Sequence, residues 1–210
     1  MKKKLALLSI VVASICSNVS AQNKSSEVAF GKGSMSIFVG YGLPNVVSNL
    51  DGYTGIGPLE VGYQYHVSNK VSLGLIYTYS HITSPVFSFS DVDQSGNLVT
   101  SAYQYDVTYS TFLARFDYFW KNSRKSAIYS GLGLGYVNVS SDMAIVTDGG
   151  NTTSIAAFSA AASGLAYHLT AVGIKYKAIG GFGGYAELGY GYDGILNLGL
   201  QYSFGGKTKK

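Results

Sequence analysis

Five ionisable side chains occur on segments that otherwise alternate between apolar and small residues: Glu60, Arg115, Asp117, Lys175 and Glu187. Each one is placed on the face opposite to the aliphatic and aromatic side chains of its segment. Charges in such surroundings must be paired, because burying a lone charge is strongly unfavourable. The set therefore predicts either a structural network that fills an interior or a constriction that filters ions.

The spacing of these charges suggests how they pair. Lys175 and Glu187 lie at equal distances from the middle of the turn between their segments, so we expect them to be direct cross-strand partners. Arg115 and Asp117 are two residues apart and share one face of a strand. We favour the structural network, since the interior of a small barrel is just wide enough to be filled by side chains.

The histidines give a weak signal for catalysis. His66, His81 and His168 have no metal-ligand spacing. His168 shares a face with Thr170, but we find no convincing serine–histidine–acid set. The sequence therefore predicts no catalytic, cofactor-binding or metal-binding residues, and no enzyme.

One acidic segment resembles the beginning of a calcium loop. In 90–97, Asp91 and Asp93 occupy alternate positions, but the later glutamate of such a loop is missing. We interpret the segment as a solvated acidic loop.

The elements that carry these residues alternate with a period of two, which predicts an all-β chain. They are about 9–12 residues long, the length of a tilted strand that crosses a bilayer. Asp193-Gly194 separates the last two, and Asp-Gly between alternating runs is a strong hairpin signal. The eight predicted strands are 33–42, 58–67, 71–80, 108–119, 127–139, 168–176, 185–192 and 195–204.

The connections between these strands alternate in length and in charge. Long segments at 43–57, 83–101 and 140–165 alternate with short turns, as in transmembrane barrels. We place Asp51, Asp91, Asp93, Asp106, Asp142, Asp148 and Asp193 on the long-loop side. We place Lys70, Lys121, Arg124, Lys125 and Lys177 on the short-turn side.

The polar face distinguishes a membrane barrel from a soluble one. A lipocalin-like barrel would turn a charged face to water. Here that face consists mostly of Gly, Ser, Asn and Gln, and charged residues are only 12% of the chain. This composition fits a crowded lumen, with the Leu, Val, Tyr and Phe side chains turned to lipid. We predict an eight-stranded antiparallel up-and-down transmembrane β-barrel over 33–204.

The N-terminus has the features of a secretory signal peptide over 1–21, with three lysines before a short apolar run. Its removal would leave 12 basic against 11 acidic residues and no cysteine, which gives no support for nucleic-acid binding, disulfides or thiolate metal sites. We expect 22–32 to be a short periplasmic segment and 205–210 a basic periplasmic tail.

The whole mature chain resembles the small outer-membrane β-barrel family of OmpA- and OmpX-type proteins. The most specific feature is the last strand, "LGLQYSF", whose Tyr202 and Phe204 match the aromatic pattern that the insertion machinery recognises in that family. Phe204 is followed by "GGKTKK", which departs from the family pattern. No peptidoglycan-binding domain follows the barrel, so a cell-wall-tethering role does not carry over.

These features predict an outer-membrane protein, both termini periplasmic, with a structural or surface-interaction role. Its partners would be outer-membrane lipids and lipopolysaccharide, the barrel-assembly machinery during insertion, and an extracellular ligand bound by loops 43–57, 83–101 and 140–165. We expect a monomer. The alternatives are a small low-conductance channel and, less favoured, a barrel enzyme that modifies lipid A. The sequence does not identify the ligand.

Overall fold

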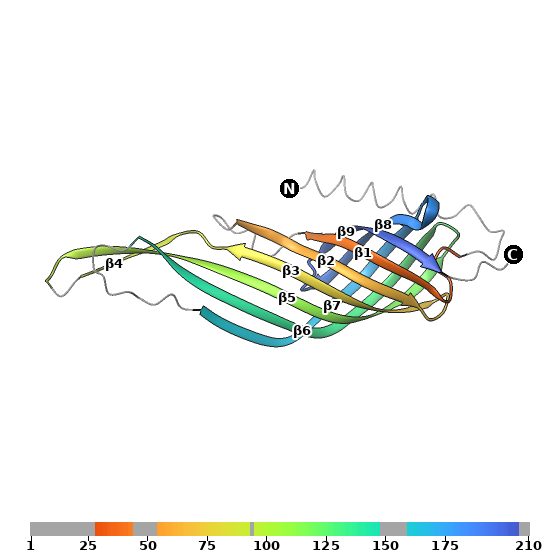
Figure 1. Ribbon diagram of the computed structural model, residues 1–210, viewed down its shortest axis with the longest axis horizontal. Helices are drawn as coiled ribbons and strands as arrows, with labels where there is room; N and C mark the ends of the chain where they lie inside the picture. The colour runs from red at the N-terminus through yellow and green to blue at the C-terminus, as the bar shows by residue number, and fades with distance from the viewer. Residues whose placement is uncertain (1–27, 44–53, 93–94, 148–158, 206–210) are drawn as a thin grey trace.

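The computed structural model describes residues 28–43, 54–92, 95–147 and 159–205, and their strands form one closed sheet (Figure 1). The predicted signal peptide and all but Gly205 of the predicted basic tail lie outside the described residues. The predicted periplasmic segment is described from Val28 onward.

The prediction of an eight-stranded antiparallel barrel is confirmed. A ninth strand, β4 (Phe87–Val92), extends the sheet beyond the barrel by pairing with the outer part of one barrel strand. The barrel strands are β1 (Ser34–Leu43), β2 (Thr54–His66), β3 (Val71–Thr83), β5 (Leu98–Asn122), β6 (Ser126–Thr147), β7 (Ser159–Lys177), β8 (Phe182–Gly191) and β9 (Leu196–Gly205).

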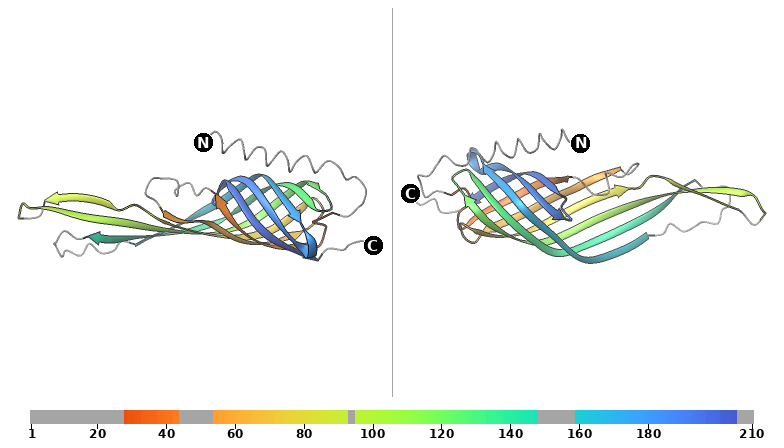
Figure 2. Two further views of the ribbon diagram at one scale, coloured as in Figure 1. Left: turned by 90° about the horizontal axis from the view of Figure 1, so that it is seen from above. Right: turned by 180° about the vertical axis from the view of Figure 1, so that it is seen from behind.

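Closure comes from two pairings that join the ends of the chain and skip β4. β1 pairs with β9, and β3 pairs with β5, so every barrel strand has two neighbours. The cross-strand partners of Val39 can be followed around the barrel in both directions until they meet on β6. Through β2, β3 and β5 they lead to Tyr136, whereas through β9, β8 and β7 they lead to Ser126. The ten-residue stagger is the shear that tilts the strands around the axis, as Figure 2 shows.

The two faces of the sheet are assigned as the alternation predicts. Outward-facing side chains are apolar and exposed, including Leu75 at 64% and Leu200 at 70%. Inward-facing positions carry Ser, Gly, Gln and the five predicted charges, with buried rings between them. The outside of the barrel is therefore a surface that lipid, and not water, would solvate favourably.

A bulge on β7 allows both ends of this strand to keep polar side chains inside. The register shifts between Thr170 and Val172, so that His168, Thr170 and Lys175 are all buried. Uninterrupted alternation would place Lys175 and His168 on opposite faces, because an odd number of positions separates them. The extra residue removes this conflict.

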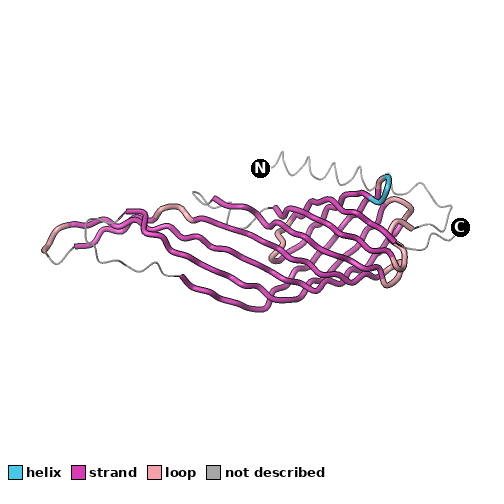
Figure 3. The backbone as a smooth tube through the Cα atoms, in the orientation of Figure 1, coloured by secondary structure: helices cyan, strands magenta, loops and turns pink. Residues whose placement is uncertain are grey.

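The strands next to the long loops extend much further than the alternation indicated. β5 has 25 residues and β6 has 22. Together with β4 and the first part of β7, they make most of the predicted loop 83–101 and part of 140–165 strand. These strands continue beyond the barrel as a protruding sheet, here meaning β4 with the outer parts of β5, β6 and β7 (Figures 1 and 3). The sequence does not predict this extension, because polar and small residues in the outer parts of these strands interrupt the apolar alternation that identifies a strand.

The opposite end of the barrel has short turns. β7 and β8 are joined through η1 (Ile179–Gly181), a single turn in which Gly180 and Gly181 have positive φ. In the described part of the chain, no helix is long and apolar enough to cross a membrane.

Candidate functional site

The structure places all five predicted charges inside the barrel, each at 5% exposure or less. Arg115 is the centre of the network. Its Nε lies 2.6 Å from Asp117 Oδ1 and its Nη2 lies 2.7 Å from Glu187 Oε1. One guanidinium thus compensates two carboxylates through charge-assisted hydrogen bonds, which are the strong class in a water-poor interior.

Lys175 joins the network through an amide. Its Nζ donates to Gln64 Oε1, and Gln64 Nε2 in turn donates to Asp117 Oδ2 and to Ser72 Oγ. The ammonium also lies 4.8 Å from the centre of the Tyr129 ring, within cation–π distance. Lys175 is therefore stabilised by dipoles and an aromatic face as well as by nearby carboxylates.

The predicted direct pairing of Lys175 with Glu187 is wrong. Lys175 is opposite Tyr185, and Glu187 is opposite Gly173. Direct pairing of Lys175 with Glu187 requires a hairpin centred on Gly181. The β7–β8 hairpin is centred one residue earlier, on Gly180, and Ala178 N donates to Phe182 O across it at 2.6 Å. Both side chains still face the lumen, but Glu187 bonds to Arg115, to the Tyr129 hydroxyl and to Thr170 Oγ1.

Glu60 lies apart from the Arg115 group. Its Oε1 accepts a hydrogen bond from the Tyr185 hydroxyl. We call the barrel end that continues into the protruding sheet the outer mouth and the end with the short turns the inner mouth. The predicted set of five charges is therefore divided between a compensated inner group and one carboxylate nearer the outer mouth. Gln64, Tyr129 and Tyr185, which bridge the set, were not identified from the sequence, although Gln64 and Tyr129 fall on the predicted lumen face.

The N-terminal segment closes the inner mouth of the barrel, which the sequence did not indicate. Phe30 is 0% exposed and its ring stacks on His66 at 5.5 Å and on Phe119 at 6.4 Å. Asn122 holds the backbone of Phe30 by accepting from its N–H and donating to its carbonyl oxygen. The predicted segment 22–32 thus packs against the barrel from Val28 onward, a contact that the sequence does not reveal because a single aromatic residue in a polar stretch carries no periodic signal.

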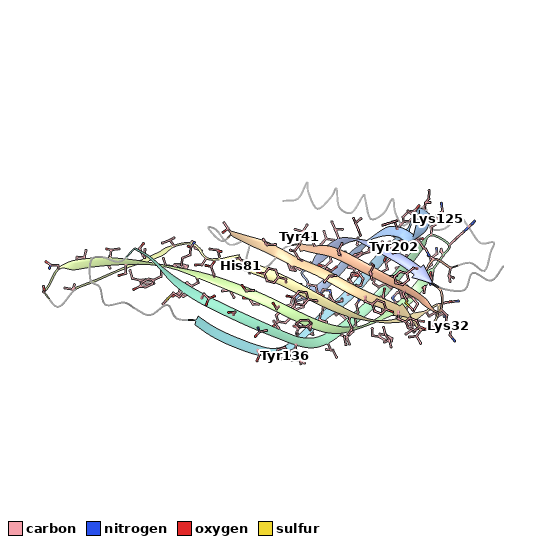
Figure 4. All side chains as sticks on the ribbon, in the orientation of Figure 1. Lys32, Tyr41, His81, Lys125, Tyr136 and Tyr202 are labelled. Atoms are coloured by element: carbon pink, nitrogen blue, oxygen red, sulfur yellow. The ribbon has the colours of Figure 1, made fainter. Side chains whose placement is uncertain are left out.

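The histidines lie in three separate environments. His66 belongs to the aromatic closure of the inner mouth. His81 lies on the outside of β3 beside Thr108, whose Oγ1 is 3.1 Å from His81 Nδ1 (Figure 4). His168 lies inside, with Nδ1 at 3.6 Å from Asp193 Oδ2.

Neither ring nitrogen of His168 has a hydrogen-bond partner among the described residues, so no hydroxyl nucleophile is poised by this histidine. Thr170 donates to Glu187, and the hydroxyl of Thr78 donates to Asp193 instead of to the histidine. His168 is only 2% exposed, so its ring is inaccessible to a lipid substrate. Within the described residues, no group of three or more His, Cys, Asp or Glu side chains could hold a metal ion.

The acidic residues assigned to the outer loops are arranged differently from the prediction. Asp193 lies in the β8–β9 turn on the long-loop side, as predicted, but it is 1% exposed and faces the lumen instead of the solvent. Asp106 and Asp142 lie directly opposite each other on β5 and β6, in strand and not in loop. Asp51, Asp93 and Asp148 lie outside the described residues, and only the backbone of Asp91 is described.

The protruding sheet presents an aromatic face. Phe87 and Tyr103 are cross-strand partners, and the ring pairs Phe87–Tyr105 and Phe89–Tyr103 have centroid distances of 6.3 and 6.0 Å. Phe89 is 62% exposed. β4 is the last strand in the sheet order, so its far edge has no strand partner in the described part of the chain.

Aromatic side chains of β8 and β9 pack together at the inner end of the barrel. The rings of Tyr202 and Phe204, the predicted insertion pattern, stack at 5.9 Å, and Phe182 packs against Tyr202 at 4.8 Å. Figure 4 shows Tyr202, Lys32 and Lys125 towards the end opposite to the protruding sheet.

No protein-family model matches the chain, and no curated protein matches it. Among solved structures, it is similar to Ail, the attachment invasion locus protein of Yersinia pestis, in complex with the heparin analogue sucrose octasulfate. Identity is 15% over 82% of this chain and 99% of that one, with a TM-score of 0.47.

Two Pseudomonas aeruginosa proteins are also similar. The N-terminal β-barrel domain of OprF is 15% identical over 83% of this chain and 99% of its own, with a TM-score of 0.45. OprG is 12% identical over 86% of this chain and 100% of its own, with a TM-score of 0.41. The strand order and register of the described residues themselves show a closed eight-stranded antiparallel barrel with one additional strand, β4.

Proposed function

We propose that this protein resides in the bacterial outer membrane with both termini in the periplasm, and that its protruding sheet binds a partner outside the cell. The exposed aromatic face of β4 and β5 is the observation that carries the proposal. Large apolar side chains exposed on a sheet remote from the barrel are characteristic of interaction surfaces.

The outward belt of the barrel supports the membrane location. Its exposed aliphatic side chains, such as Leu75, Leu134 and Leu200, would be solvated by lipid chains. Aromatic side chains at the inner end, including Tyr202 and Phe204, suit the membrane–water interface. Contacts with outer-membrane lipids and lipopolysaccharide, recognition of the last strand by the assembly machinery, and a monomeric state are parts of the same proposal.

The orientation follows from the two ends of the barrel. Outer-membrane barrels have short turns towards the periplasm and longer loops outside. The short turns here carry Lys70 and Lys125, and the opposite end continues into the protruding sheet. We therefore assign the protruding sheet to the cell exterior.

The binding surface combines two recognition features. The face formed by Phe87, Phe89, Tyr103 and Tyr105 offers aromatic area, which contributes strongly to interfaces because these rings lose little side-chain entropy. The outer edge of β4 offers backbone groups to which an extended segment of a partner protein could add as a strand. A protein partner with an exposed strand or extended segment fits both.

The test displays the protein on cells that lack adhesins and measures their retention on fibronectin, on collagen and on a cultured cell monolayer. A Phe87→Ser/Phe89→Ser/Tyr103→Ser variant removes the aromatic face, and Ser88→Ala/Ser90→Ala on the other face of β4 is the matched control. We expect the aromatic variant to lose retention and the control to keep it. Equal retention of both variants, or no retention of cells with the unsubstituted protein, would contradict the proposal.

A low-conductance channel is the second candidate, favoured by the many polar side chains along the lumen. The Arg115 network and the Phe30 closure argue against it, because they occupy the path along the axis. Planar-bilayer recordings separate the two functions. We expect no stable ohmic conductance steps from the purified protein; such steps would favour the channel.

A further inference from the structure

The outer part of the lumen holds polar side chains whose atoms are not all satisfied. Glu60 Oε2, Asp193 Oδ2 and both side-chain atoms of Asn197 have no hydrogen-bond partner among the described residues. The same is true of both ring nitrogens of His168. These residues are at most 4% exposed, and buried polar groups in native proteins are nearly always paired.

Two glycines of β1 leave room for this cluster. A Cβ on Gly40 would come within 2.6 Å of Glu60 Oε1, and one on Gly42 within 2.7 Å of Asn197 Oδ1. Successive inward positions on a strand are separated by roughly 7 Å. The Glu60 and Asn197 side chains therefore lie at successive inward positions of β1, and the backbone of Asp193 also approaches Gly42.

Asp193 brings the second carboxylate into the cluster. Its Oδ1 accepts a hydrogen bond from Thr78 Oγ1 at 2.5 Å, which holds the turn across the outer mouth. Its other oxygen lies 3.6 Å from His168 Nδ1. Glu60, Asp193 and Asn197 thus each contribute one oxygen with no hydrogen-bond partner among the described residues.

The charges of the lumen do not balance in this outer part. In the inner group, Arg115 and Lys175 compensate Asp117 and Glu187. The partners of Glu60 and Asp193 in the described chain are two hydroxyl groups and a histidine ring, and none of them is a lysine or arginine. Two buried carboxylates therefore lack a fixed cation, which is costly unless something supplies positive charge.

We propose that this outer-lumen cluster, defined as Glu60, Asp193 and Asn197, binds one Ca²⁺ ion. Two carboxylate charges match a divalent cation, and oxygen donors of mixed type suit calcium, which tolerates irregular shells. The cluster has only two carboxylates, so the Asn197 amide oxygen and water would have to complete the shell. Zinc is disfavoured because it prefers nitrogen and sulfur ligands.

Binding would join the β8–β9 turn to β2 and β9. Asp193 belongs to the turn, Glu60 to β2 and Asn197 to β9, so one ion would fix the cover of the outer mouth. The proposal is independent of the surface-binding function, because none of its residues belongs to the protruding sheet.

The test uses the full barrel in detergent micelles, stripped with chelator and titrated with CaCl₂. Calorimetry measures binding, and Trp120 fluorescence follows thermal unfolding. Glu60→Gln and Asp193→Asn keep side-chain size and the hydrogen bonds from Tyr185 and Thr78. Asp142→Asn, at an exposed carboxylate on β6, is the control.

We expect the unsubstituted protein to bind calcium and to gain thermal stability from it. Each lumen variant should bind at least about tenfold more weakly, since affinity follows the number of charged ligands. The control should bind normally. In chelator, Glu60→Gln should unfold at a higher temperature than the unsubstituted protein, because it removes an uncompensated charge.

Two results would overturn the proposal. One is equal thermal stability of the unsubstituted protein in calcium and in chelator. The other is an unchanged calcium response in both lumen variants. If a carboxylate variant fails to fold, Asn197→Ser weakens the same shell without changing charge and must also reduce binding. If thermal stability depended on the protonation of His168 and not on calcium, the missing positive charge would be a proton and the calcium site would be wrong.

Discussion

Arg115 Nη2 lies 2.7 Å from Glu187 Oε1, although the residues are 72 positions apart in the chain and β6 and β7 separate their strands. The contact therefore crosses the lumen instead of following the sheet. Together with Asp117, Lys175 and Gln64, it fills the inner half of the barrel with compensated charge.

Breaking this contact should strongly destabilise the barrel. Arg115→Met would leave Asp117 and Glu187 buried without their cation, a loss of about 3–5 kcal/mol in unfolding free energy. Urea unfolding in lipid vesicles, followed by the fluorescence of the single tryptophan, Trp120, measures it. Lys70→Met in an exposed turn is the control.

A double variant separates pairing from side-chain size. In Arg115→Met, the carboxylates of Asp117 and Glu187 both lack their cation. Arg115→Met/Glu187→Gln removes the charge of the second, so the double variant should be more stable than Arg115→Met alone. A double variant that is no more stable than the single one would show that the charges are not coupled.

The inner mouth should depend on Phe30. Phe30→Ala would leave a cavity between His66 and Phe119, at a cost of about 3–5 kcal/mol. The same urea assay measures this, with Lys32→Ala, at an exposed side chain nearby, as the control. A Phe30→Ala protein as stable as its control would mean that the segment does not close the lumen.

Two glycines on β7 provide a matched comparison. A Cβ on Gly173 would press against the Tyr129 ring, whereas one on Gly164 meets nothing within 4 Å. Gly173→Ala should therefore cost about 1–3 kcal/mol through overpacking. Gly164→Ala should be neutral or slightly stabilising. Similar unfolding midpoints for the two variants would contradict the described packing of Tyr129.

The barrel itself could be predicted because its signal is periodic. Leu, Val and aromatic residues at every second position define both the strands and the face turned outward. The same alternation placed Glu60, Arg115 and Glu187 inside, since their positions relative to those residues fix their direction.

Pairing across the lumen could not be predicted in this way. The register of β7 and β8 depends on the positive-φ turn at Gly180 and Gly181, and a shift of one residue changes every cross-strand partner. Arg115 contacts Glu187 because the strands are tilted and the sheet closes into a barrel, and the spacing of residues along one strand does not reveal either. Phe30 lies outside any alternating segment, and the small polar residues of β5 and β6 concealed the protruding sheet.

The central claim is that the barrel spans the outer membrane with its protruding sheet outside, and cysteine labelling tests it most directly. Leu98→Cys is placed on the protruding sheet, at a position 73% exposed, and Lys125→Cys on a short turn at the other end. On intact cells, a membrane-impermeant maleimide should label Leu98→Cys, and it should label Lys125→Cys only after the outer membrane is permeabilised. Labelling of Lys125→Cys, but not of Leu98→Cys, on intact cells would contradict the account.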